Sequence, residues 1–167
     1  RRDDHVDTQL SLIAPLEART DIESINDPAR NTREAAANDD WQRALRAADE
    51  ARAAVISELP DRLAALHREI TSALDSNDYQ TAKTSFERFE RIVEVLIEIA
   101  EAEDRPRVVE SARVMRRELG EALEEQQATV REDTEELEER AERLQARAEE
   151  YRDEGAVVEA VRTYADA

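Results

Sequence analysis

The stretch that decides the fold runs from Arg107 to Arg152 and reads RVVESARVMRRELGEALEEQQATVREDTEELEERAERLQARAEEYR. It contains no proline and a single glycine, Gly120, and it is dense in Glu, Arg, Ala, Leu and Gln, which all propagate helices well. At about 1.5 Å per residue, one helix over this stretch would span roughly 65–70 Å. The sequence therefore predicts a helix far longer than the average of about 11–12 residues.

A heptad repeat marks one side of this helix. Large side chains recur at every seventh position, at Leu123, Val130, Leu137, Leu144 and Tyr151. Smaller or polar residues follow four positions after the first four of them, at Gln127, Thr134, Ala141 and Ala148. Such a stripe suits close coiled-coil packing and is stable only against a partner. We expect it to pair with a second copy in an antiparallel homodimer, or to fold back on residues 28–58. The predicted self-association seam consists of Leu123, Val130, Leu137, Ala141, Leu144, Ala148 and Tyr151.

Composition favours helix throughout the chain. The 167 residues include only two glycines and four prolines. There is no cysteine, which excludes disulfides, thiolate metal sites and a cysteine nucleophile. The two glycines also exclude the common glycine-rich nucleotide fingerprints.

The charge balance is strongly acidic and nearly free of lysine. Asp and Glu number 42 against 24 basic residues, a net charge of −18, and Lys83 is the single lysine. In this respect the chain resembles proteins of extremely halophilic archaea, which implies a surface adapted to molar salt, where screening shortens repulsion between carboxylates. The alternative is an anionic surface that binds a cationic partner or repels nucleic acid.

Shorter helices, separated by prolines, are predicted before the long one. Pro15 interrupts an apolar helical pattern, so we expect a kink or a fresh helix there. We expect Asp27 to cap a helix that begins at Pro28. A helix from Trp41 should end before Pro60, because the residue preceding a proline is pushed out of helical geometry.

The predicted organisation is an all-α fold of antiparallel helical hairpins. Pro60 opens a further helix, and the most apolar helix, Tyr79 to Glu103, belongs at the buried centre. Gly155 suits a left-handed helix stop, followed by a short terminal helix. We expect a hairpin bundle over 1–105, and over 106–167 the long helix with the short terminal helix packing on it, all forming one structural unit.

A weak internal repeat accompanies the helix starts. The segment 38–45 (NDDWQRAL) resembles 76–83 (SNDYQTAK), and 155–161 (GAVVEAV) matches both in its small and apolar positions. At these residues the chain resembles the second helix of tetratricopeptide-type hairpins, which implies stacked hairpins and a peptide-binding surface. The family's 34-residue period is not kept.

One basic island runs against the acidic background. It consists of Arg105, Arg107, Arg113, Arg116 and Arg117, opposed only by Glu110. It could dock an anionic group, such as a phosphate backbone, an acidic peptide or a nucleotide. Alternatively, these arginines pair internally with neighbouring acidic helices.

Residues for chemistry are scarce. His5 and His67 are the only histidines, and neither has a Glu three positions before it, as a di-iron helical bundle requires. Glu94 and Glu98 are the candidates for a carboxylate-only metal site. We assign no catalytic, cofactor-binding or metal residue.

The sequence leads to three candidate functions. The first is a non-enzymatic helical protein–protein interaction or scaffold module, with protein partners that include itself. The second is an accessory of nucleic-acid machinery that docks an anionic partner on the basic island, although we do not expect nucleic acid as the main partner. The third is a carboxylate metal-binding or enzymatic bundle. No apolar run is long enough to span a membrane and no signal peptide is visible, so we expect a cytoplasmic protein.

Overall fold

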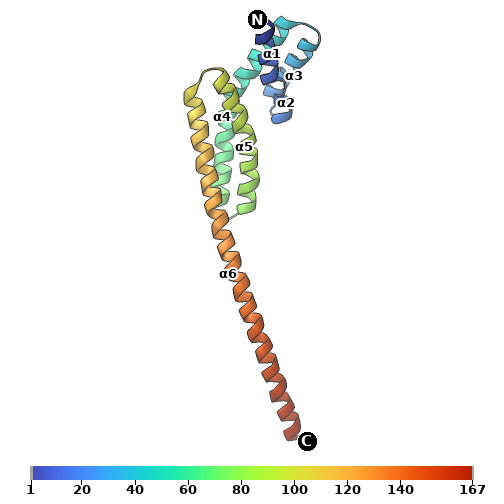
Figure 1. The fold of residues 1–167 in the computed structure, drawn as a ribbon, viewed down its shortest axis with the longest axis vertical. Helices are drawn as coiled ribbons and strands as arrows, with labels where there is room; N and C mark the ends of the chain where they lie inside the picture. The colour runs from blue at the N-terminus through green and yellow to red at the C-terminus, as the bar shows by residue number, and fades with distance from the viewer. Residues whose placement is uncertain (1, 167) are drawn as a thin grey trace. The chain divides into compact units, whose positions relative to one another are not determined.

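The computed structural model describes residues 2–166, with side chains described at 4–158, 161 and 162. All regular structure in this range is α-helical and no strand occurs in it, which confirms the all-α prediction. The predicted long helix is present as the last helix of the chain (Figure 1). The helices are α1 (Arg2–Ile13), α2 (Leu16–Arg19), α3 (Glu23–Ala37), α4 (Trp41–Asp75), α5 (Tyr79–Ala102) and α6 (Pro106–Asp166).

The chain divides into two compact units, Arg1–Glu124 and Glu125–Ala167. The first unit holds α1 to α5 and residues 106–124 of α6, which we call the first segment of α6. The second unit consists of the second segment of α6, from residue 125 onward. The division comes later than the boundary expected after residue 105, because the first segment buries four side chains in the core of the first unit: Val109, Ala112, Leu119 and Leu123.

The core of the first unit lies between helices that run in alternating directions. Figure 1 shows α4, α5 and the first segment of α6 side by side, and α1 and α3 against the N-terminal part of α4. As predicted, α5 is the most completely buried helix. Its interior positions include Phe89, Val93, Val95, Ile99 and Ala100, all fully buried.

The same turn closes α3, α4 and α5. Each turn contains one residue in the left-handed region, Asp39 (φ 59°), Asn77 (φ 56°) or Asp104 (φ 55°). The next backbone N–H then donates to a carbonyl five residues earlier, at 2.8–2.9 Å, as in a Schellman motif. Asp40 and Asp78 then cap the following helices by accepting from the N–H of the residue three positions later, each at 3.2 Å.

These turns account for the first two copies of the internal repeat, whereas the third predicted copy is wrong. The matching segments at 38–45 and 76–83 are turns of this kind, as expected from their sequences. The third copy expected at Gly155 is wrong, because α6 continues through it and no glycine in the described chain has positive φ. The true third turn spans 103–106 and ends in Pro106 instead of an aromatic residue.

The predicted stop and short terminal helix after Gly155 are therefore wrong. A single interior glycine costs a helix only about 0.5–1 kcal/mol relative to alanine, and nothing after it reverses the chain. Residues 156–166 extend α6 as one helix.

Two of the proline predictions are also wrong. Pro60 lies inside α4 instead of dividing it, and it is solvent-exposed. One apolar face runs across it, with Val55 and Leu59 before it and Leu63 after it nearly or fully buried. Burying each such side chain stabilises the helix by about 1.5–3 kcal/mol, so the three together outweigh the roughly 3 kcal/mol that an interior proline costs.

Pro28 is likewise inside its helix. Helix α3 begins at Glu23, because the Asn26 amide donates to the Thr20 carbonyl (2.8 Å) and accepts from the Thr20 hydroxyl (2.8 Å), which fixes the entry turn. Asp27 is therefore no N-cap. At Pro15 the prediction is confirmed, since α1 ends at Ile13 and α2 begins at Leu16.

Candidate functional site

The heptad stripe changes character along α6. Leu123 is 6% exposed and belongs to the core of the first unit. Val130 is 40% exposed, Leu144 54%, Tyr151 63% and Leu137 64%. In the second segment, every described residue from 128 to 158 is exposed.

The uncovered stripe is longer than the sequence predicted. Val158 lies seven residues after Tyr151 and is 49% exposed, so it continues the large positions. Gly155 falls four residues after Tyr151 and continues the small ones. Sequence reasoning missed both residues because it ended the helix at Gly155, although the spacing of seven was the signal that could have found them. We define the uncovered seam as Val130, Leu137, Leu144, Tyr151 and Val158, with the small residues Thr134, Ala141, Ala148 and Gly155 between them.

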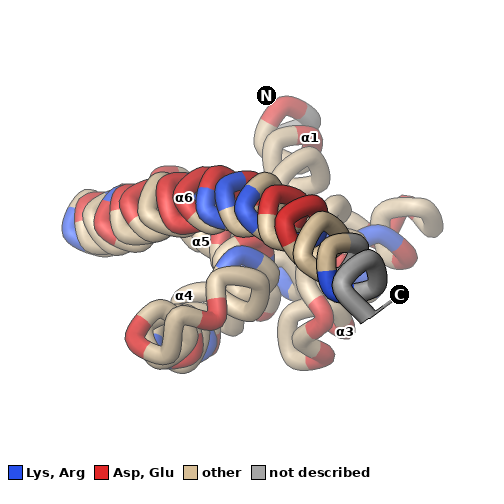
Figure 2. Tube along the Cα trace, turned by 90° about the horizontal axis from the view of Figure 1, so that it is seen from below, with Lys and Arg blue, Asp and Glu red and all other residues tan. Residues whose placement is uncertain are grey.

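The second segment is helical on its own sequence. Glu136 and Arg140, like Glu139 and Arg143, are spaced four apart with the acid first, the order that supports a helix best. The Thr134 hydroxyl donates to the Val130 carbonyl at 2.7 Å, so its hydrogen is already bonded within the helix. Figure 2 shows acidic and basic residues following one another along α6.

The basic island does not gather on one face. Arg107 and Arg116 are nine residues apart, about two and a half turns, so they lie on opposite sides of α6. Arg105 pairs with Glu103 at 3.3 Å, and Arg113 pairs with Glu101 at 2.5 Å. These two ion pairs neutralise part of the local positive charge.

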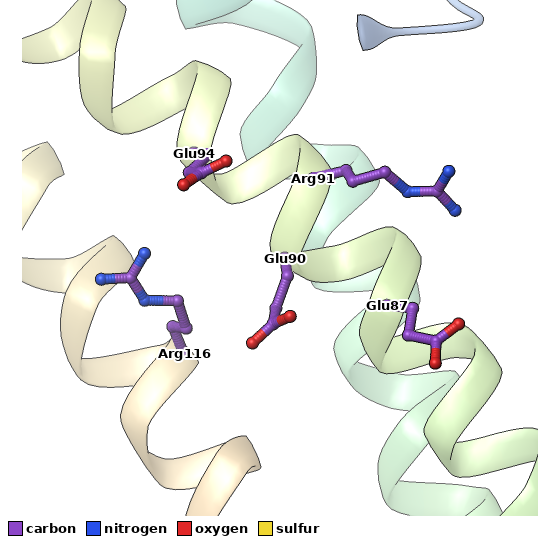
Figure 3. A pocket seen from close by; sticks show the side chains of 5 residues that line it. All are labelled: Glu87, Glu90, Arg91, Glu94 and Arg116. Carbon is purple, nitrogen blue, oxygen red and sulfur yellow. The ribbon is translucent and has the colours of Figure 1, made fainter.

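Arg116 faces the acidic strip of α5. It lines a hollow of about 540 Å³ with Glu87, Glu90, Arg91 and Glu94, and Figure 3 shows Arg116, Glu90 and Glu94 on the two sides of the space between the helices. With three carboxylates around it, this hollow is not a place for an anion. Arg117 is exposed on the next position of α6.

A second hollow, of about 520 Å³, collects arginines that are distant in sequence. Arg19 comes from α2, Arg62 from α4, and Arg88 and Arg91 from α5, with Leu66 and Ile92 among the apolar lining. Asp21 and Glu69 are the acids on its wall. Sequence reasoning missed this cluster, because no local spacing connects three separate helices.

One of these arginines is already neutralised. Arg19 binds Glu98 through two hydrogen bonds, of 2.5 and 3.1 Å, and lies 3.8 Å from Glu94. The hydrogen bond to Glu98 raises the pKa of the Arg19 guanidinium above its ordinary value, against the opposing effect of partial burial. Glu94 and Glu98, the candidates for a carboxylate metal site, thus face an arginine.

Within the described residues, no group of three or more His, Cys, Asp or Glu side chains is arranged to hold a metal ion. In residues 2–166, no helix has both the length and the hydropathy needed to cross a bilayer. Comparisons of the chain with protein-family models, curated proteins and solved structures found no match.

Proposed function

We propose that this chain is a non-enzymatic helical interaction module, and that the uncovered seam of α6 is its binding surface. The observation that carries the proposal is the exposure of Leu137, Leu144 and Tyr151 on a strict heptad spacing. Single exposed apolar residues are ordinary, whereas a periodic row of them along one helix is typical of an interface.

The expected gain from covering the seam is enough for association. Full burial of a large apolar side chain contributes about 1.5–3 kcal/mol, and about half of each seam side chain is still exposed. Its five large residues then supply several kcal/mol from one side alone. Loss of translational and rotational freedom opposes binding by an estimated 4–15 kcal/mol, so we expect a reversible complex of moderate affinity.

We also propose that the acidic exterior serves solubility at high salt rather than recognition. The acids of the second segment are distributed around the helix instead of on a single face. Between residues 125 and 139, seven acids and one arginine give a net charge of −6. In dilute buffer this charge opposes the approach of another acidic surface, and salt near 1 M screens it beyond about 3 Å.

A photo-cross-linking experiment in cells that produce the protein tests the seam as a binding surface. A benzophenone amino acid replaces Leu137 or Leu144 in the full chain, and the matched controls carry it at Glu139 or Ala146, which are also exposed but lie on the opposite side of the helix. We expect adducts, with this chain or another protein, that are several-fold more abundant from the two seam positions. Equal yields from both sides of the helix would overturn the proposal.

A further inference from the structure

We infer that the occupant of the uncovered seam is a second copy of this chain, in an antiparallel pair centred near residue 146. This inference rests on the proposed function, because it specifies the partner of that surface. It depends on the residues that flank the seam and on the alternation of large and small side chains along it.

The flanking residues carry charges of both signs. One flank, one position after each large residue, carries Arg131, Glu138, Gln145 and Arg152. The other flank, three positions after each large residue, carries Asp133, Arg140, Arg147 and Glu154. All eight are exposed, and they are the positions that face a partner helix beside the apolar core of a coiled coil.

A parallel, in-register pair is opposed by these charges. It places Asp133 beside Glu138 of the second copy, and Arg147 beside Arg152 of the second copy. Two-fold symmetry repeats each like-charged contact. A parallel pair staggered by one heptad avoids some of this repulsion but does not close, because each chain then leaves one heptad of its seam open to a further copy.

The volumes of the seam residues also favour the antiparallel pair. A parallel pair would stack leucine on leucine and alanine on alanine in alternate layers, so that wide and narrow layers conflict. An antiparallel pair puts a large residue opposite a small one in every layer, which allows uniform close packing. The register centred near residue 146 opposes Leu144 to Ala148, Tyr151 to Ala141, Leu137 to Gly155 and Val158 to Thr134.

This register also satisfies the flanks. Glu138 lies beside Arg152 of the second copy on one flank, and Arg140 lies beside Glu154 of the second copy on the other. Symmetry gives four pairs of opposite charge, and Arg147 beside its own copy is the one pair of like charge. The whole interface falls within the part of α6 where the stripe is uncovered.

The competing antiparallel registers satisfy fewer of these conditions. Moving the centre to about residue 142 puts Arg131 beside Arg152 and Asp133 beside Glu154. A centre near residue 136 requires the stripe at Leu123, which is already buried in the first unit. A centre near residue 139 puts Glu138 beside Glu138 and Arg140 beside Arg140 of the second copy, two pairs of like charge instead of one. A centre near residue 149 leaves Leu137 opposite a charged residue, Arg162.

The absence of cysteine makes distance measurement by spin labels direct. Single cysteines replace Glu132, Ala146 or Asp153 in the full chain at about 2 M salt; all three positions point away from the seam. In the inferred pair, the two labels at 146 lie at the same height along the helix axis and are separated only by the width of the two helices. The labels at 153 gain roughly 20 Å along the axis and those at 132 roughly 40 Å, at about 1.5 Å per residue.

Each outcome decides a part of the inference. Separations that increase in the order 146, 153, 132 support it. Equal separations for all three labels mean a parallel pair and overturn it, and a shortest separation at 132 overturns the register. No dipolar coupling, with a monomer mass by light scattering, overturns self-pairing, while the photo-cross-links to another protein would still support the proposed function.

A charge exchange provides a second test that does not alter the apolar seam. Glu138→Arg or Arg152→Glu alone turns two favourable contacts into like-charged ones, and we expect each to weaken dimerisation about tenfold at the lowest salt at which the chain stays folded. The double exchange should restore the dissociation constant to within about threefold of the wild type. Equal weakening by the double variant would overturn the register, and unchanged helicity by circular dichroism controls for folding.

Discussion

The heptad stripe of α6 begins in the first segment, where it is buried, and continues in the second segment, where it is exposed. In the first segment, the stripe residue Leu123 is 6% exposed, because it packs in the core of the first unit. In the second segment, Leu137 and Leu144 are 64% and 54% exposed. The comparison teaches that a periodic apolar stripe identifies a contact surface, whereas the rest of the chain decides whether that surface becomes core.

The largest expected difference between the two segments comes from the same substitution at two equivalent heptad positions, one buried and one exposed. Leu123→Asp buries a carboxylate without a partner, and we expect it to lower the free energy of unfolding of the first unit by about 3–5 kcal/mol. Leu144→Asp should change that free energy by less than about 0.5 kcal/mol, because the site is exposed. Urea unfolding of both variants, at a concentration that keeps the chain monomeric, measures the difference.

A comparable loss of stability for Leu144→Asp under these conditions would mean that the second segment is covered within a single chain. The combined variant Leu137→Asp with Leu144→Asp should leave the first unit folded and abolish self-association by light scattering.

Lowering the salt should distinguish the two segments next. The second segment carries a net charge of −6 over residues 125–139 on an uncovered helix, whereas the first unit has a buried apolar core that opposes the repulsion among its own acids. We expect helicity to fall as sodium chloride is reduced from 3 M to 0.1 M, with the loss concentrated in the second segment. Circular dichroism gives the total, and hydrogen exchange by residue locates it; helicity that is flat over this range would contradict the adaptation to high salt.

The two glycines of α6 offer a smaller, matched comparison. A Cβ added at Gly120 would lie 3.5 Å from the Phe86 ring, an ordinary contact, and a Cβ at Gly155 would meet nothing within 4 Å. Gly120→Ala should therefore raise the free energy of unfolding of the first unit by about 0.5–1 kcal/mol, the usual advantage of alanine in a helix. Gly155→Ala should leave that transition unchanged and increase helicity; a loss of stability at Gly120 would show that the Phe86 contact is tighter than described.

The smallest effect concerns the cap of α5. The Thr81 hydroxyl donates to the Asp78 carboxylate at 2.6 Å, and with the Thr81 N–H it lowers the pKa of Asp78. A lowered folded pKa means that the stabilisation is present above the ordinary Asp value of about 3.9 and is lost as the pH falls through the folded pKa. Asp78→Ala should lower the Tm by a few degrees at neutral pH, and the difference from wild type should shrink below about pH 4.

Asp40 is the control for this cap, since it accepts from the Arg43 N–H at 3.2 Å without a hydroxyl partner. Asp40→Ala should have the smaller effect at neutral pH. A difference between wild type and Asp78→Ala that grows on acidification would contradict the assignment.

Much of the fold followed from the sequence, because helical periodicity and Asn/Asp turns are local signals. The heptad at Leu123 to Tyr151 gave the long helix, and the segments 38–40 and 76–78 gave two of the turns. The prolines at 28 and 60 were misjudged because proline does not always interrupt a helix. Where buried side chains lie on both sides of it, their burial stabilises the helix by more than one interior proline destabilises it.

The candidate site was predictable in part for the same reason. Spacing alone predicts the large and small positions of the seam. It does not predict that the stripe is exposed beyond Leu123, because that depends on where the neighbouring helices α4 and α5 end. The cluster of Arg19, Arg62 and Arg88 could not be found in the sequence, because three helices must assemble before it exists.

The three interhelical turns have a consequence for how this protein could become more heat-resistant. Asp39, Asn77 and Asp104 hold left-handed conformations in which a Cβ is unfavourable, and glycine would relieve up to about 1 kcal/mol at each. A triple glycine variant should therefore melt at a higher temperature with every apolar residue of the bundle unchanged. Together with Gly120, these corners of the chain are where the fold has stability left to gain.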